Sequence, residues 1–166
     1  GTVKNDSYSW FTDAFAAAGL AEYAIASGRD DDEYLIRLIF DNLQTFLKTP
    51  GFDQFYHHPL DPTYIWHGPH MIGLNLSQIL RPYIGGEVVD DFAGYCLDRI
   101  MNLFGKNEHR MIFELLDHEG NIVENDLGVR VNPGHAIESS WFCMEEALYL
   151  NDRGRFEKAA ALCDRA

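Results

Sequence analysis

The chain has few basic residues and no long apolar run, and each shortage excludes a class of protein. Its 13 Lys and Arg residues oppose 26 Asp and Glu residues, which gives a formal net charge of −13. Such an acidic surface repels nucleic-acid phosphates and anionic membranes, so we expect neither as a partner. No apolar run approaches the roughly 20 residues that span a bilayer. We therefore expect no transmembrane segment.

Cysteine is also scarce. Cys96, Cys143 and Cys163 are far apart in the sequence, and no C-x-x-C pair suggests a zinc or redox site. Each lies in an apolar helical stretch, where a free cysteine behaves as a small hydrophobic residue. The opening residues, GTVKNDSYSW, lack the basic-then-apolar order of a signal peptide. These features favour a reducing, cytoplasmic compartment.

Apolar residues recur at helical spacing through most of the chain. The predicted helices cover residues 8–27, 32–48, 69–83, 87–105, 134–150 and 153–165. Strand spacing occurs in HRMIFELL (109–116), which a turn at DHEGN (117–121) joins to a second arm over 121–131. Because strands and helices do not alternate, a parallel sheet is excluded. The sequence predicts one mainly α domain over residues 1–166, made of antiparallel helix pairs with an inserted β-hairpin.

The stretch NPGHAIESSWF (132–142) places a histidine at the start of a predicted helix. Pro133 has the backbone angle of a first helical turn, and Gly134 allows a tight bend. His135 then lies near the positive end of the helix dipole, which favours a neutral ring that can accept a proton. Glu138 lies one turn later on the same face, within reach of that ring. His135 and Glu138 are therefore candidate catalytic residues for proton transfer, with a capping or packing role for the histidine as the alternative.

Several segments resemble the N-acylglucosamine 2-epimerase family, which also contains cellobiose 2-epimerases and aldose–ketose isomerases. The family's hallmark segment is similar to RVNPGHAIESSWFCMEEA (130–147). An earlier helix with a G-L-A-E-Y core resembles FTDAFAAAGLAEYAIASG (11–28), and an inserted hairpin resembles RMIFELLDHEGNIV (110–123). A looser match is MIGLNLSQILR (71–81). The likeness extends through nearly the whole chain.

The resemblance implies an (α/α)6 barrel, of which this chain would form the central part. It also implies a cofactor-free reaction on a small sugar, in which one histidine removes the proton at C2 and a second histidine returns it from the opposite face. His135 matches the first histidine, and Glu138 matches the acidic residue one helical turn later. The family's second histidine and an arginine of its early helices have no counterpart in this chain, and we expect them to lie outside it.

Three departures from the family pattern bear on the substrate. Cellobiose-type members carry a tyrosine, an asparagine and a histidine at the positions of Phe11, Gly68 and Ile72. These differences argue against a disaccharide substrate, whereas the NPGH motif is more similar to that of the N-acylglucosamine branch of the family. The expected activity is 2-epimerisation of an N-acylhexosamine or related aldose.

A histidine-rich segment, HHPLDPTYIWHGPH (57–70), precedes the third predicted helix. His67 and His70 have an H-x-x-H spacing that can ligate a metal on a helix. We expect the intervening Gly68-Pro69 to break that helix, so we predict no metal site. His67 and His70 are instead candidate sugar-binding residues, with exposed loop positions as the alternative.

Other functions are also compatible with the sequence. A half-barrel without the second histidine would suit a non-catalytic sugar-binding or interaction module, and two copies would complete a site as a homodimer. The α/α scaffold also supports glycoside hydrolysis by two carboxylates, although no pair stands out. Glu114 and Arg110 share one face of the predicted strand, where they would overhang a cleft or pair with each other.

Overall fold

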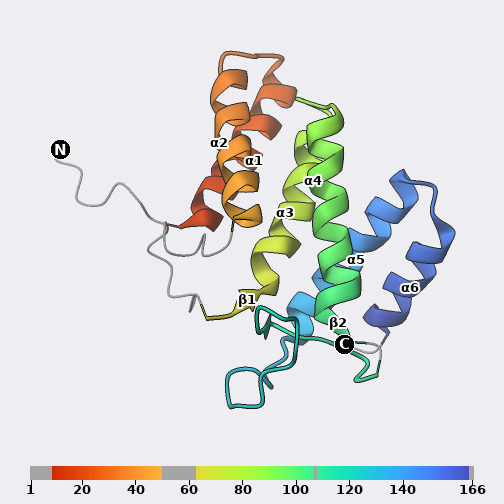
Figure 1. Cartoon of the computed structure of the whole chain (residues 1–166). Helices are drawn as coiled ribbons and strands as arrows, with labels where there is room; N and C mark the ends of the chain where they lie inside the picture. The colour runs from red at the N-terminus through yellow and green to blue at the C-terminus, as the bar shows by residue number, and fades with distance from the viewer. Residues whose placement is uncertain (1–8, 50–62, 107, 165–166) are drawn as a thin grey trace.

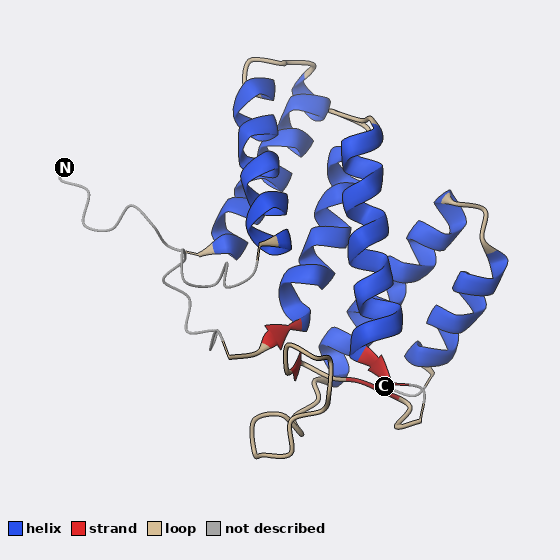
Figure 2. Ribbon diagram, in the orientation of Figure 1, coloured by secondary structure: helices blue, strands red, loops and turns tan. Residues whose placement is uncertain are grey.

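The protein is mainly α-helical, as its sequence predicts (Figure 2). A computed structural model describes residues 9–49, 63–106 and 108–164. The helices are α1 (Trp10–Ser27), α2 (Glu33–Lys48), α3 (His67–Leu80), α4 (Glu87–Asp98), α5 (Pro133–Tyr149) and α6 (Arg153–Cys163), and a π-helical segment, η2 (Arg99–Phe104), extends α4. None of the described helices is long and apolar enough to cross a membrane.

The helices form antiparallel pairs arranged around a central helix, α3 (Figure 1). Helix α3 contacts α1 on one side and α5 on the other, and each of these three helices packs against the helix that follows it in the chain. The N-termini of α1, α3 and α5 all lie at the end of the molecule where the short strands are found (Figure 1). This arrangement brings together, at one end, residues that are far apart in the sequence.

Small residues allow the helices to approach closely. The buried face of α1 carries Ala14, Ala17, Ala21 and Ala24, which recur every three to four residues. On α3, a Cβ atom added to Gly73 would lie 2.9 Å from the Cys96 sulfur and 3.2 Å from the Phe92 ring on α4. A larger residue at position 73 would therefore push α3 and α4 apart.

A β-hairpin lies between the helices as expected, but it is formed by residues 105–112 and not by the predicted arms 109–116 and 121–131. Strand β2 (Gly105–Lys106) pairs antiparallel with β3 (Met111–Ile112), and β4 (Leu115–Leu116) pairs antiparallel with β1 (Ile65–Trp66). The single strand expected over 109–116 is thus divided between two partners that precede it in the chain.

The second arm expected over 121–131 forms no strand. The Asn125 side chain accepts hydrogen bonds from the backbone N–H groups of Leu127 and Gly128, at 3.0 and 2.8 Å, and so directs this segment into a local turn. The predicted turn at 117–121 is confirmed, because the Asp117 carboxylate accepts a 2.7 Å hydrogen bond from the Asn121 N–H.

The expected helix break at Gly68-Pro69 is wrong. Helix α3 begins at His67, and Pro69 lies in its first turn, where the missing N–H would have no partner within the helix. His67 and His70 therefore share one helical turn. Residues 57–62 of the histidine-rich segment lie outside the described part of the chain.

Candidate functional site

The N-terminus of α5 fixes the position of His135. Asn132 caps the helix: its side-chain oxygen accepts a 3.3 Å hydrogen bond from the His135 N–H, and Pro133 follows as the first helical residue. Asn132 is the last residue in an extended conformation, and Gly134 already lies within the helix. A Cβ atom at Gly134 would lie 3.2 Å from the capping oxygen, so glycine leaves room for the cap.

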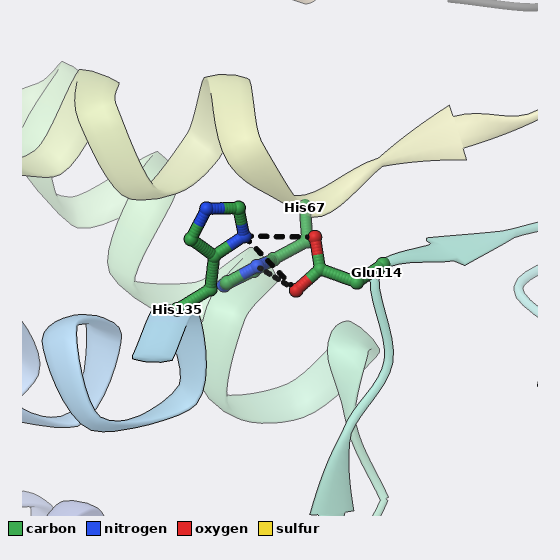
Figure 3. A group of neighbouring side chains, drawn as sticks. All are labelled: His67, Glu114 and His135. Carbon is green, nitrogen blue, oxygen red and sulfur yellow. Dashed lines mark hydrogen bonds and ion pairs between the residues drawn. The ribbon is translucent and has the colours of Figure 1, made fainter. Parts of the chain in front are cut away.

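The carboxylate that reaches the His135 ring belongs to Glu114. His135 Nδ1 lies 2.9 Å from Glu114 Oε2 and 3.1 Å from Oε1 (Figure 3). Glu138, which the sequence suggested as the partner of this ring, lines an open cleft that is described below. Glu114 lies between β3 and β4, and its carbonyl oxygen accepts a 2.9 Å hydrogen bond from the His67 N–H. One residue thus connects the first turns of α3 and α5.

The Glu114 contact determines which nitrogen of His135 can act as a base. Partial burial would raise the pKa of Glu114, but the imidazoles of His67 and His135 outweigh it, so the pKa of Glu114 is lowered. An ionised carboxylate only accepts hydrogen bonds. A neutral His135 must therefore carry its proton on Nδ1, which leaves a lone pair on Nε2.

His67 lies behind this pair. Its side chain is fully buried, and its Nε2 is 2.8 Å from the Ser139 hydroxyl on α5. Its Nδ1 lies 3.8 Å from Glu114 Oε1, beyond hydrogen-bond distance, and has no hydrogen-bond partner among the described residues. We refer to His67, Glu114 and His135 as the His–Glu–His cluster.

His70 is also buried, beside the rings of Tyr95 and Phe104. Its Nδ1–H donates a 2.8 Å hydrogen bond to the Trp66 carbonyl oxygen. Burial lowers the pKa of His70 to about 3, so the ring is neutral at physiological pH. Neither His67 nor His70 is among the residues that line the cleft described next, whereas the sequence had suggested them as sugar contacts.

An open cleft of about 490 Å³ lies in front of the cluster. Its lining consists of Phe11, Phe15, Trp66, Gly68, Pro69, Met71, Ile72, Glu114, His135 and Glu138. The lining is mostly apolar and aromatic, and its volume falls within the range of small-molecule sites. Phe11, Gly68 and Ile72, the departures noted in the sequence, all lie on this surface. Glu114 overhangs the cleft, one of the two placements expected for it.

A buried ion pair holds α3 and α5 together at the other end of the two helices. The Arg81 guanidinium contacts both carboxylate oxygens of Glu146, at 2.6 and 3.1 Å, and Glu146 is 1% exposed. Burial alone would lower the pKa of Arg81, but hydrogen bonds to Glu146 and Asp90 outweigh it and raise that pKa. The pair supports the relative position of the helices that carry His67 and His135.

Comparison with known proteins is consistent with this architecture. The profile of the N-acylglucosamine 2-epimerase (GlcNAc 2-epimerase) family matches residues 1–166. The fold is similar to the crystal structure of a sugar epimerase from a ruminal bacterium, with a TM-score of 0.76 and 18% sequence identity, over 95% of this chain and 43% of that chain. A search of curated proteins gave no match. The chain thus forms part of an (α/α)6 barrel and spans less than half the length of that structure.

Proposed function

Because the chain belongs to the N-acylglucosamine 2-epimerase family, we propose that it supplies one acid–base histidine of a sugar 2-epimerase or aldose–ketose isomerase. The observation that carries this proposal is the hydrogen bond between His135 Nδ1 and Glu114. It leaves Nε2 of a 40% exposed ring as the basic atom beside an open cleft.

The proposed reaction is a proton transfer at carbon. The proton at C2 of an open-chain sugar is acidic because it lies next to the aldehyde. His135 Nε2 takes this proton, and the electron pair of the broken C–H bond moves towards the C1 oxygen to give an enolate-like intermediate. The Glu114 carboxylate stabilises the imidazolium that forms. A second acid, on the opposite face of the sugar, returns a proton to C2 and inverts its configuration.

The cleft lining supports an N-acylhexosamine as the substrate class. Phe11 and Ile72 give the cleft apolar surface that suits the methyl group of an acetamido substituent. Glu138 is a hydrogen-bond acceptor for a sugar hydroxyl on the same surface. The N-termini of α1, α3 and α5 lie at this end of the molecule, and their positive dipole ends favour the negative charge that develops on the C1 oxygen.

We place the reaction in a reducing, cytoplasmic compartment. Cys96 and Cys143 are free and buried in the helical core. Burial raises the pKa of Cys143 to about 12, so its thiol stays protonated and unreactive. Such thiols serve as packing groups and need no oxidising environment.

Isotope exchange tests the proposed function. The full-length protein is incubated in D₂O with N-acetylmannosamine, and deuterium at C2 is followed by NMR. His135→Asn should lower the exchange rate by at least about 100-fold, because general acid–base groups contribute about 10²–10⁴ to rates. His118→Asn, at an exposed position outside the cleft lining, should leave the rate unchanged.

Two results would contradict the proposal. Undiminished exchange in His135→Asn would remove His135 from the chemistry. Sugar binding without any exchange by the wild-type protein would indicate a non-catalytic sugar-binding module instead.

A further inference from the structure

The His–Glu–His cluster has the composition of a metal site. Its candidate ligand atoms, one nitrogen from each histidine and one Glu114 oxygen, all lie within 4.8 Å of one another (Figure 3). Two histidines and one glutamate, with a further position left open, form a donor set common in zinc sites. Ligands at about 2.1 Å from a tetrahedral ion lie about 3.4 Å apart, so atoms that are now up to 4.8 Å apart would have to approach by as much as about 1.4 Å.

The surroundings of the buried His67 ring also indicate a bound cation. Its Nδ1 is fully buried, has no hydrogen-bond partner among the described residues, and lies 3.8 Å from Glu114 Oε1. A buried polar atom without a partner costs free energy, which a bound cation would recover. The other ring nitrogen is 2.8 Å from the Ser139 hydroxyl. Metal-binding histidines are held in this way, through a hydrogen bond from the nitrogen that does not ligate the ion.

We propose that the His–Glu–His cluster binds a divalent transition-metal ion of the Zn²⁺ type. His67 Nδ1, His135 Nδ1 and a Glu114 oxygen provide three ligands, and a fourth position faces the cleft, where water or a sugar oxygen completes the coordination. Imidazole nitrogens favour Zn²⁺, Co²⁺ or Ni²⁺ over Mg²⁺ and Ca²⁺, which prefer oxygen ligands. His135 is 40% exposed, so the ion can enter from the cleft.

Metal binding would oppose proton transfer, a consequence that rests on the proposed function. Without an ion, His135 Nδ1 carries the proton that it donates to Glu114, and Nε2 is free to act as the base. A ligated Nδ1 gives up that proton, and the neutral ring then carries its proton on Nε2. The imidazole cannot accept a proton from C2 in that state. The ion is therefore an inhibitor of the proposed reaction.

Cobalt titration of the full chain tests the site without any assay of activity. We expect Co²⁺ to give a visible absorption spectrum of nitrogen and oxygen ligation at one equivalent, and Zn²⁺, but not Mg²⁺, to abolish it. Glu114→Gln and His135→Gln each remove a direct ligand. Each should therefore weaken Co²⁺ binding by more than the roughly 10–100-fold that the loss of an outer-shell partner typically costs. His118→Gln, at an exposed histidine outside the cluster, is the matched control and should bind as the wild type does.

Three outcomes would overturn the site. They are the absence of a cobalt spectrum, Co²⁺ binding by Glu114→Gln and His135→Gln that is as tight as in the wild type, and a thiolate-to-cobalt band that assigns the ion to cysteine. The deciding variants are at partly exposed side chains, and circular dichroism verifies their fold. His67→Gln alters a fully buried residue and so serves only as supporting evidence.

Combining the titration with isotope exchange separates this inference from the proposed function. Exchange in the presence of a chelator, without any cobalt binding, supports the function and overturns the metal site. Cobalt binding that depends on Glu114 and His135, without exchange under any condition, supports the site and overturns the function. If both hold, Zn²⁺ should suppress exchange, and a chelator should restore it.

Discussion

Glu114 Oε2 lies 2.9 Å from His135 Nδ1, and this contact joins the segment between two short strands to the first turn of α5. The carboxylate fixes the ring's orientation and its protonated nitrogen. A residue that acts through another in this way is a positioning residue, and its removal should alter the rate more than the affinity.

Glu114→Gln should lower the rate of deuterium exchange at C2 by about 10–100-fold, since loss of a supporting partner typically costs this much. KM for the sugar should change little, because Glu114 is proposed to act on the His135 ring. Steady-state kinetics of the full-length protein would measure both values. Glu145→Gln, at an exposed glutamate on α5, is the matched control. An unchanged kcat with a raised KM would instead make Glu114 a substrate contact.

Ser139→Ala should lower the free energy of unfolding by about 1–3 kcal/mol, because it leaves buried His67 Nε2 without its partner. Ser140→Ala provides a matched control on the next residue. The buried Ser140 hydroxyl donates a hydrogen bond to the Ala136 carbonyl oxygen within the same helix, so its removal leaves no other side chain without a hydrogen-bond partner. Urea denaturation would compare the variants. Equal losses in both would show that the Ser139 hydroxyl contributes no more than an ordinary helix contact.

Glu146→Gln should destabilise the protein by about 1–3 kcal/mol, because it removes the charged bidentate partner of Arg81, which keeps only its ion pair with Asp90. The double variant Arg81→Met/Glu146→Leu should recover most of that loss, since neither charge remains. Denaturant unfolding measures both. A double variant that is as unstable as Glu146→Gln would mean that the packing of these side chains, not their charge, holds α3 to α5.

The free energy of unfolding should fall as the pH decreases from about 6.5 towards 3. The pKa of His70 is about 3 in the folded chain and 6.5 in its ordinary state, so between these values the unfolded chain binds a proton that the folded chain excludes. The loss is up to about 1.4 kcal/mol per pH unit. Glu114, whose pKa is lowered, adds a loss in the same direction at lower pH.

His70→Gln should reduce this dependence while keeping a donor for the Trp66 carbonyl oxygen. Between about pH 7 and about pH 5, the change in unfolding free energy should be smaller than in the wild type by about 2 kcal/mol. Urea denaturation at each pH gives the comparison. Parallel pH profiles would show that the pKa of His70 is not lowered in the folded chain.

The helices could be predicted from the sequence because their signals are local. Apolar spacing and capping residues act within one or two turns, so the six helices fall close to the predicted ranges. The strands depend on distant partners: β4 pairs with β1, about fifty residues earlier, and no local pattern determines that choice. Pro69 was misleading because its effect depends on its position within the helical turn.

The site was predictable only in part, for the same reason. His135 was found from the local NPGH motif, whose asparagine proves to be the helix cap. The strand pattern predicts that Glu114 overhangs a cleft or pairs with Arg110, but it does not predict the contact with His135, which depends on tertiary packing. Ser139 gave no signal in the sequence, because its role depends on a histidine that is 72 residues away.

The protonation of His135 is the most direct test of the account. Nitrogen-15 NMR of the metal-free full chain, with His135→Gln used to assign the signals, distinguishes the two nitrogens of each neutral ring. We expect a proton on Nδ1 of His135 and no proton on Nε2. In Glu114→Gln this preference should weaken. A neutral ring with its proton on Nε2 would contradict the proposal, because the atom proposed as the base would then have no lone pair to accept the C2 proton.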